Sequence, residues 1–241
     1  MTRPVRARLV PAAASLALVL AALTGCSAID SLTGSDDPSP APTAAPTATE
    51  TPYDSQFTRD GTFQSHIDVN GVDFVYTLYP TKSTPRTNEW YPKGNKYFSF
   101  TFQAYDLDQP IRAPFDTKRE VYLEHMTVTS QTKTSGGGPS QSPYELDVVA
   151  EDATFDPEPQ TTKYGMLITS PKGAFELRNQ KIGPMAQDTV GLDLFFTATV
   201  WIEEKAGSHK FYKRQIKQKV PIAIFPSKKP TDVASIPIDA N

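Results

Sequence analysis

The sequence predicts an all-β fold, an antiparallel β-sandwich that is immunoglobulin-like in architecture, and three observations support this prediction. Apolar and polar residues alternate with a period of two in several segments, which is the pattern of half-buried strands. Turn-forming residues separate these segments, with 13 Gly and 22 Pro in 241 residues. No window shows the longer period of an amphipathic helix. A small β-barrel of the lipocalin type is the alternative architecture.

The first two strands are expected at Thr62–Val69 and Phe74–Tyr79, on either side of Asn70 and Gly71. Both residues of this dipeptide tolerate positive φ, which a type I′ turn requires at its two central positions. The sequence therefore predicts a tight β-hairpin here.

The clearest alternation covers Tyr97–Tyr105. Its apolar set, which would face the core, is Phe98, Phe100, Phe102 and Ala104. The opposite set is Tyr97, Ser99, Thr101, Gln103 and Tyr105. A second long strand is expected at Val190–Glu203, with six apolar residues from Leu192 to Ile202 on one face.

Another strand is expected at Val121–Thr129, with Val121, Leu123 and His125 on one face and Tyr122, Met126 and Val128 on the other. Weaker strands are expected at Leu146–Ala150, Tyr164–Thr169, Ala174–Leu177 and Phe211–Phe225. Pro221 cannot donate to a ladder, so the last strand should be an edge or should bend there.

Two segments between these strands are predicted to be surface loops, Thr132–Pro143 and Ala150–Pro159. The first contains three consecutive glycines. A phosphate-binding loop would need a strand before it, a helix after it and a Lys-Ser/Thr pair. Those features do not accompany the glycines, so a plain loop is expected.

The N-terminus has the layout of a secretory signal, with Arg3, Arg6 and Arg8 before an apolar stretch from Leu9 to Leu23. The stretch ends in Leu-Thr-Gly-Cys, which resembles the lipobox of bacterial lipoproteins. That resemblance implies cleavage before Cys26, transfer of a diacylglyceryl group to its sulfur, and acylation of the new amino group by a fatty acid such as palmitate. An uncleaved transmembrane anchor is the alternative, but the apolar run is short for a span of roughly 20 residues.

Cys26 is the single cysteine of the chain. An unpaired cysteine in an exported protein calls for an explanation, and lipidation supplies one. Together the acyl chains would hold the protein on the outer face of the cell membrane.

The sequence divides into a signal peptide at residues 1–25, a Pro/Ala/Thr-rich linker at 26–56, one domain at 57–226 and a tail at 227–241. Five prolines lie between positions 38 and 52 among Ala, Thr and Ser. Such a composition cannot bury enough apolar surface to fold, so the linker should be extended and should hold the domain clear of the membrane.

Composition argues against several classes of function. The net charge is −3 and the charges are mixed, so a nucleic acid partner is not expected. The sequence contains no Gly-x-Ser-x-Gly, no His-Glu-x-x-His and no cysteine in the domain. We therefore expect neither an enzyme nor a cofactor.

A metal site is a weaker hypothesis. The possible soft ligands are His66, His125, His209, Met126, Met166 and Met185. His125 and Met126 are adjacent, so on a regular strand they would face opposite ways and would need a bulge to share an ion. Two acidic groups, Asp106 with Asp108 and Asp116 and Asp152 with Asp156 and Glu158, lack a glycine turn that would organise a calcium loop.

Aromatic residues suggest a binding surface, because Trp and Tyr dominate protein hot spots and form platforms for sugars. The predicted surface residues are Trp90, Tyr91, Tyr97, Tyr105 and Trp201. The alternative for Trp90 is a plug over the open end of the sandwich. The face with Trp201 is expected to be either covered by another strand or used by a partner.

The sequence thus predicts a membrane-anchored, non-enzymatic binding module, or an accessory subunit that binds a protein of the cell envelope. A module that binds cell-wall glycan is the first alternative. An extracytoplasmic metal-binding protein is the second.

Overall fold

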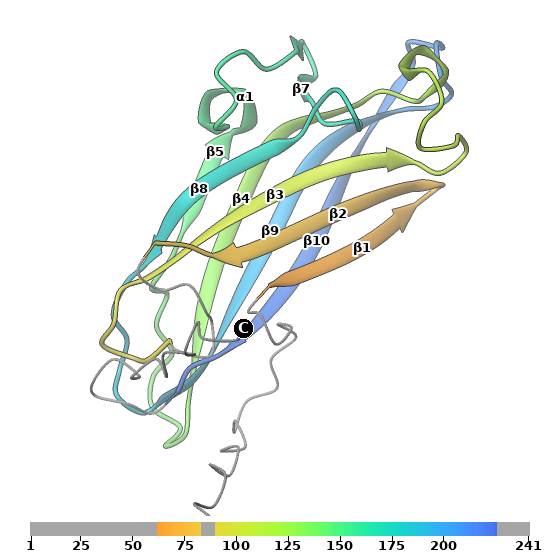
Figure 1. Cartoon of the computed structure of the whole chain (residues 1–241). Coiled ribbons are helices and arrows are strands. Elements are labelled where there is room, and N and C mark those ends of the chain that lie inside the picture. The colour runs from red at the N-terminus through yellow and green to blue at the C-terminus, as the bar shows by residue number, and fades with distance from the viewer. Residues whose placement is uncertain (1–61, 83–89, 226–241) are drawn as a thin grey trace, which may run out of the picture. The chain divides into compact units, whose positions relative to one another are not determined.

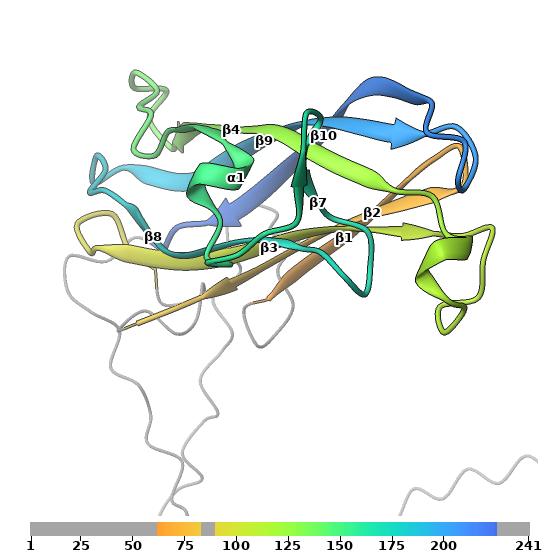
Figure 2. The same ribbon diagram turned by 90° about the horizontal axis from the view of Figure 1, so that it is seen from above.

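The computed structural model describes residues 62–82 and 90–225, which form two antiparallel sheets packed face to face (Figures 1 and 2). This confirms the predicted sandwich, and the two sheets do not close into a barrel. The signal peptide, Cys26, the linker, the segment 57–61 and the C-terminal tail lie outside the described residues. Within the described ranges, no helix is long and apolar enough to cross a membrane.

Sheet A has the strand order β1-β2-β3-β8. Its strands are β1 (Phe63–Val69), β2 (Val72–Pro80), β3 (Lys96–Asp106) and β8 (Phe175–Ile182). The turn between β1 and β2 is at Asn70 and Gly71, with φ of 54° and 79°. The predicted hairpin is confirmed, and both residues have the positive φ that its sequence favours.

Sheet B has the order β10-β9-β4-β7-β6, and β5 also pairs with β4. Its strands are β4 (Val121–Thr134), β5 (Leu146–Val149), β6 (Thr161–Thr162), β7 (Gly165–Leu167), β9 (Thr189–Glu203) and β10 (Phe211–Ala223). The chain crosses between the sheets after β3, after β7 and after β8. The first of these connections contains the short helix η2 (Phe115–Thr117).

Two expected loops differ from the structure in detail. Residues Ala150–Ala153 form one turn of helix, α1, where the sequence predicted a loop throughout. Four residues are too few to show a helical period, so the pattern gave no warning. Strand β4 continues to Thr134 and so includes the first three residues of the predicted glycine-rich loop.

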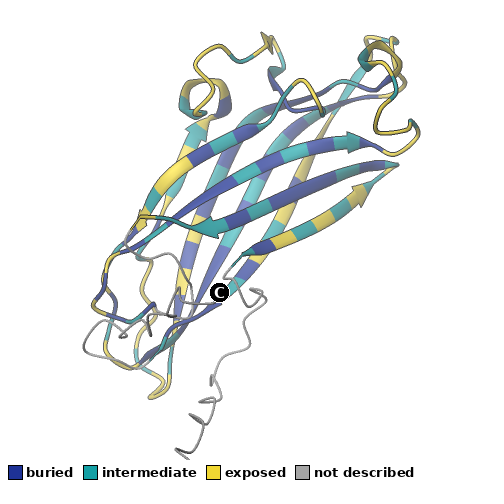
Figure 3. Cartoon of the chain, viewed as in Figure 1, coloured by how far each residue is buried: buried dark blue, intermediate teal, exposed yellow. Residues whose placement is uncertain are grey.

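The core lies between the sheets and is built from alternate residues of each strand, as the banded burial in Figure 3 shows. The predicted inward sets of β3 and β9 are both buried. Aromatic contacts join the layers, because Tyr76 and Phe100 of sheet A both contact Phe196 of sheet B, with centroids 5.5 and 5.1 Å apart. Such pairs add to the burial of apolar area.

The alternation predicted for β4 is wrong beyond Leu123. A register shift in the pairing with β9 lies between Leu123 and His125. The bulge turns Met126 into the core, where its exposure is 0%, and leaves His125 on the outer side. A bulge inserts one extra residue and so exchanges the two faces downstream of it.

Strand β10 forms one edge of sheet B, as Pro221 predicted. Its exposed residues are mostly basic: Lys213, Arg214, Gln215, Lys217 and Lys219. Lys219 pairs with the buried carboxylate of Asp193 on β9, at 3.1 Å. Charged side chains of this kind are common on edge strands.

Candidate functional site

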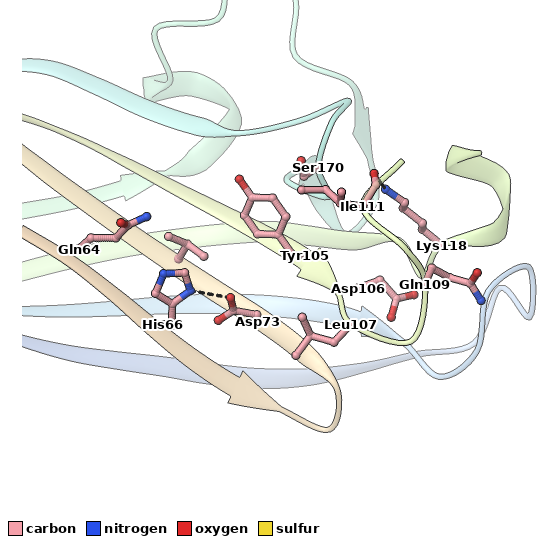
Figure 4. A pocket seen from close by; sticks show the side chains of 11 residues that line it. Gln64, His66, Asp73, Tyr105, Asp106, Leu107, Gln109, Ile111, Lys118 and Ser170 are labelled. Atoms are coloured by element: carbon pink, nitrogen blue, oxygen red, sulfur yellow. Dashed lines mark hydrogen bonds and ion pairs between the residues drawn. The ribbon is translucent and has the colours of Figure 1, made fainter. Parts of the chain in front are cut away.

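A pocket of about 420 Å³ lies on the outer face of sheet A, where side chains of three neighbouring strands and the following loop converge (Figure 4). We call it the sheet A pocket. It is lined by Gln64, His66, Asp73, Val75, Tyr105, Asp106, Leu107, Gln109, Ile111, Lys118 and Ser170. Polar and apolar side chains are mixed in this lining, which is usual for binding pockets.

Alternate residues of the strands point to the outer face of sheet A, and these residues form the polar half of the pocket. His66 on β1 and Asp73 on β2 lie on the outer face, and the imidazole Nδ1 is 2.7 Å from the Asp73 carboxylate. Tyr105 comes from the next strand, β3, and its hydroxyl donates to Gln103 Oε1 at 2.7 Å. These groups offer hydrogen bonds, and the His66 side chain remains 60% exposed.

The apolar half comes from the loop between β3 and β4. Leu107 is 54% exposed and Ile111 is 70% exposed. The ammonium group of Lys118 donates to the Ile111 carbonyl oxygen at 2.7 Å and so holds the loop in place. The loop therefore presents two aliphatic side chains to solvent on a fixed backbone.

A buried ion pair anchors the same loop to the β1–β2 turn. Arg119 binds the Asp106 carboxylate and also donates to the carbonyl oxygens of Asn70 and Gly71, each at 2.8 Å. Burial alone would raise the pKa of Asp106, but the hydrogen bonds from Arg119 hold it below its usual value. A buried charge needs such partners, so this end of the sandwich depends on the pair.

A second group of side chains lies on the outer face of sheet B, and we call it the aromatic surface. It comprises Tyr122 on β4, Tyr164 in the β6–β7 turn, Trp201 on β9 and Phe211 on β10. Ring centroids are 4.5 Å apart for Tyr164 and Phe211 and 5.1 Å for Tyr164 and Trp201. A neighbouring depression of about 270 Å³ is lined by Glu120, Tyr122, Thr162, Lys163, Tyr164, His209 and Phe211.

Gly165 accounts for the position of Tyr164. Its φ is +107°, and a Cβ there would lie 2.2 Å from the Leu123 carbonyl oxygen of β4. Only glycine fits this close approach, which lets the β6–β7 turn fold its tyrosine over Trp201. One of the two expectations for Trp201 is thus met in part, because this turn covers some of the ring.

The five predicted surface residues do not form one surface. Trp90 is 1% exposed and packs in the core, which agrees with the alternative of a plug rather than with a position on a surface. Tyr97 and Tyr105 share a face of β3 but are eight residues apart, about 26 Å along a strand. Tyr105 lines the sheet A pocket, whereas Trp201 belongs to the aromatic surface.

The two remaining tyrosines lie towards the other end of β3. Tyr91 is partly buried, and its ring lies against Gly94, whose added Cβ would be 2.5 Å from Tyr91 Cε1. The ammonium group of Lys82 lies 4.5 Å from the centroid of the Tyr97 ring. Neither residue reaches the sheet A pocket or the aromatic surface.

Lys96, the first residue of β3, is fully buried beside this segment. Its ammonium group donates to the carbonyl oxygens of Gly94 at 2.6 Å and Pro92 at 3.3 Å. Burial lowers the pKa of Lys96 to about 8. The group fixes the loop before β3 and lies away from both candidate sites.

The residues considered for metal binding are dispersed. In residues 62–82 and 90–225, no three His, Cys, Asp or Glu side chains are placed to hold an ion. His66 pairs with Asp73 and His125 with Asp147, while the three methionines Met126, Met166 and Met185 are buried in the core. Asp106 and Asp108 both bind Arg119.

Three residues that define the candidate sites were not singled out from the sequence: Leu107, Ile111 and Tyr164. Leu107 and Ile111 lie in a stretch rich in Asp, Pro and Gln, where aliphatic side chains have no core to enter. That mismatch was a usable signal. Tyr164 carries no such signal, because its position depends on how a turn folds back over the sheet.

The sequence matches no protein family and no curated protein. Among solved structures, the copper-reconstituted P19 protein from Campylobacter jejuni aligns with 12% identity and a TM-score of 0.27, over 68% of this chain and 96% of that one. Two copper-bound variants of the same protein align with 11% and 10% identity and TM-scores of 0.26 and 0.25. Alignments at these scores do not establish a shared fold, and nothing about this chain follows from them.

Proposed function

We propose that this chain is a lipid-anchored, extracytoplasmic and non-enzymatic binding module that docks a protein of the cell envelope through the sheet A pocket. The observation that carries the proposal is the pair of exposed aliphatic side chains, Leu107 and Ile111, at a pocket that also contains Tyr105. The chain would then act as an accessory subunit.

Exposed aliphatic side chains are informative when they gather in one place. Among the described residues, four large apolar side chains are exposed: Leu107, Ile111, Val149 and Phe155. Two of these four lie at the sheet A pocket. Desolvating them against a partner is favourable, at roughly 25 cal/mol per Å² of apolar surface.

The pocket is also held rigid before any partner binds. Arg119 fixes the loop from below through Asp106, and Lys118 bonds the loop carbonyl at Ile111. A preformed surface loses less conformational entropy on association, which favours a protein partner. The polar side chains His66, Asp73 and Tyr105 would supply orientation.

The site of action rests on the N-terminal residues. A lipid on Cys26 would place the domain on the outer face of the cell membrane, and the linker at 26–56 would give it reach. Replacement of Cys26 by Ser should abolish acylation, measured by intact mass of the protein from the membrane fraction. Acyl chains on the Cys26→Ser protein would contradict this part of the proposal.

Docking can be tested with a photoreactive amino acid at position 111 of the full lipidated chain in living cells. The matched control is the same group at position 149, because Val149 is also exposed, at 45%, but lies on β5 of the other sheet. We expect one membrane protein to crosslink in near-stoichiometric amount to the group at position 111. The same crosslinked product should be absent when the group is at position 149, and Leu107→Asp should abolish it at position 111. Equal products at both positions, or none, would overturn the proposal.

A further inference from the structure

The aromatic surface differs in chemistry from the sheet A pocket. Its side chains are rings, and none of the four exposed large apolar residues of the described chain contributes to it or to its depression. Trp201, Tyr164 and Phe211 are each partly exposed. Rings of this kind present a face of π electrons to polarised C–H groups, such as those on one side of a pyranose.

The polar ends of the rings are already occupied. Trp201 Nε1 donates to Glu124 Oε2 at 2.6 Å, and the Tyr122 hydroxyl donates to Glu120 Oε2 at 2.8 Å. Burial and the neighbouring Glu120 raise the pKa of Tyr122, so its hydroxyl stays protonated and remains a donor. These bonds fix the orientation of the Trp201 and Tyr122 rings. The ammonium groups of Lys213 and Lys163 lie 4.9 and 5.0 Å from the centroids of the Trp201 and Tyr164 rings, so a sugar that stacks on these faces displaces them.

The adjoining depression supplies hydrogen bonds next to the rings. Thr162 offers a hydroxyl, Lys163 an ammonium group, His209 an imidazole and Glu120 a carboxylate. Donors and acceptors of this variety match the hydroxyl groups of a sugar, which both donate and accept. A purely apolar ligand would leave these groups unpaired at a cost.

The charges around the surface are balanced. Lys163 and Glu120 both line the depression, and Lys213 pairs with Glu124 at 2.7 Å beside Trp201. Neither a strongly anionic nor a strongly cationic polymer is favoured by such a lining. The ligand that fits is therefore uncharged and rich in hydroxyl groups.

We infer that the aromatic surface is a binding site for a neutral glycan chain, with Tyr164 and Trp201 stacked on its sugar rings and the depression holding a flanking unit. The site lies on sheet B, away from the sheet A pocket, so it is independent of the proposed docking of a protein. A tethered module with both sites would bind wall glycan and a membrane partner at once.

Intrinsic fluorescence offers a direct test, because the chain has two tryptophans and Trp90 is buried. The full lipidated chain carrying Trp90→Phe would report on Trp201 alone. It should be reconstituted in nanodiscs, since glycoside detergents would compete. Titration with the neutral oligosaccharides chitotetraose, cellotetraose and maltotetraose should give a saturable change for at least one of them.

Variants separate ring stacking from other causes. Tyr164→Ala should weaken binding about fivefold, because an aromatic contact contributes roughly 1 kcal/mol. Tyr164→Phe keeps the ring and should bind within about twofold of the parent. Tyr105→Ala, in the sheet A pocket, is the control and should bind as the parent does.

Cosedimentation of the unsubstituted chain with insoluble chitin and cellulose is the second readout and does not depend on Trp90→Phe folding well. Absence of saturable binding to all three soluble glycans and to the insoluble material would overturn the inference. Binding that survives Tyr164→Ala unchanged, or that is lost with Tyr105→Ala, would overturn it as well. Neither result would affect docking at position 111.

Discussion

The outer faces of the two sheets both expose apolar side chains to solvent, but they hold these side chains in different ways. On sheet A, the pocket exposes aliphatic side chains from a loop, and a buried ion pair beneath holds that loop. On sheet B, aromatic side chains come from the strands themselves, and a short turn with Tyr164 covers part of them. The first arrangement is stabilised by charge below the surface, the second by ring contacts on it.

This difference predicts that a substitution can disrupt the outer face of one sheet without disrupting that of the other. Arg119 and Asp106 contact the β1–β2 turn and the loop before β4, whereas the aromatic surface depends on β4, β9, β10 and the β6–β7 turn. Damage to one set of contacts should therefore change one face and spare the other, apart from a shared loss of overall stability.

The largest expected effect is that of Arg119→Met. It leaves the carboxylate of Asp106, whose side chain is 3% exposed, without its cation. Removing one partner of a buried pair costs about 3–5 kcal/mol in the free energy of unfolding. Urea denaturation measures it, with Asp108→Asn as the control.

Asp108 also binds Arg119, at 2.9 Å, but its side chain is 70% exposed. Its replacement should cost less than about 1 kcal/mol, as exposed ion pairs do. Equal losses for Arg119→Met and Asp108→Asn would show that the buried pair does not hold the sheet A face.

The next effect is that of Gly165→Ala on sheet B. The added Cβ would meet the Leu123 carbonyl, and the positive φ adds strain, so we expect a loss of about 2–3 kcal/mol. Displacement of Tyr164 should also change the emission of Trp201 in the Trp90→Phe background. Gly137→Ala is the matched control, since Gly137 also has positive φ, +68°, but has no atom within 4 Å of the added Cβ. If Gly165→Ala changed the emission of Trp201 but left the melting temperature normal, the turn would have moved without contributing to the stability of the fold.

A third effect concerns pH and Lys96, at the opposite end of β3 from Asp106. Its pKa of about 8 in the folded chain is below the 10.5 of an ordinary lysine, so the unfolded chain binds more protons between these values. The free energy of unfolding should therefore rise by about 2–3 kcal/mol as pH increases from 8 to 10.5, relative to Lys96→Met.

Other lysines and tyrosines titrate in that window as well, so the comparison with Lys96→Met is essential. Lys217→Met, at an exposed position on β10, should follow the unsubstituted chain. A Lys96→Met protein with the same pH profile as the unsubstituted chain would refute the assignment of the effect to Lys96.

The smallest effect is that of Lys213→Ala. This change removes an ion pair with Glu124 in which both side chains are more than 40% exposed, so less than about 1 kcal/mol of stability is at stake. The Trp201 indole keeps its bond to Glu124, and its emission maximum should shift only slightly. A large loss of stability, measured by thermal melting, would show that the aromatic surface is held by charge in the way that sheet A is.

Local signals predicted most of the fold. Asn70 and Gly71 placed the first hairpin, alternation placed β3 and β9, and Pro221 placed β10 at an edge. These features depend on neighbours in sequence, where steric and burial rules act directly. The order of strands in each sheet depends on contacts between distant segments, and no local pattern encodes it.

The candidate sites were harder to predict for the same reason. Tyr97 and Tyr105 were grouped because they share a face, although eight residues of strand separate them. Trp90 seemed exposed because its surroundings are polar, yet it closes the core. The bulge at Glu124 adds one residue to β4, and nothing in the sequence of that strand marks where the alternation breaks.

The basic residues of β10 have a consequence for a protein confined to a surface. With the lipid anchor proposed above, copies of the chain would share two dimensions rather than three, so their edge strands would meet far more often than in dilute solution. Arg214 and Lys217 would repel the same strand of a neighbouring copy, and Pro221 offers it no N–H to pair with. Crowding on the membrane would then leave each domain free to find its own partner, because sheets of neighbouring copies could not join into one.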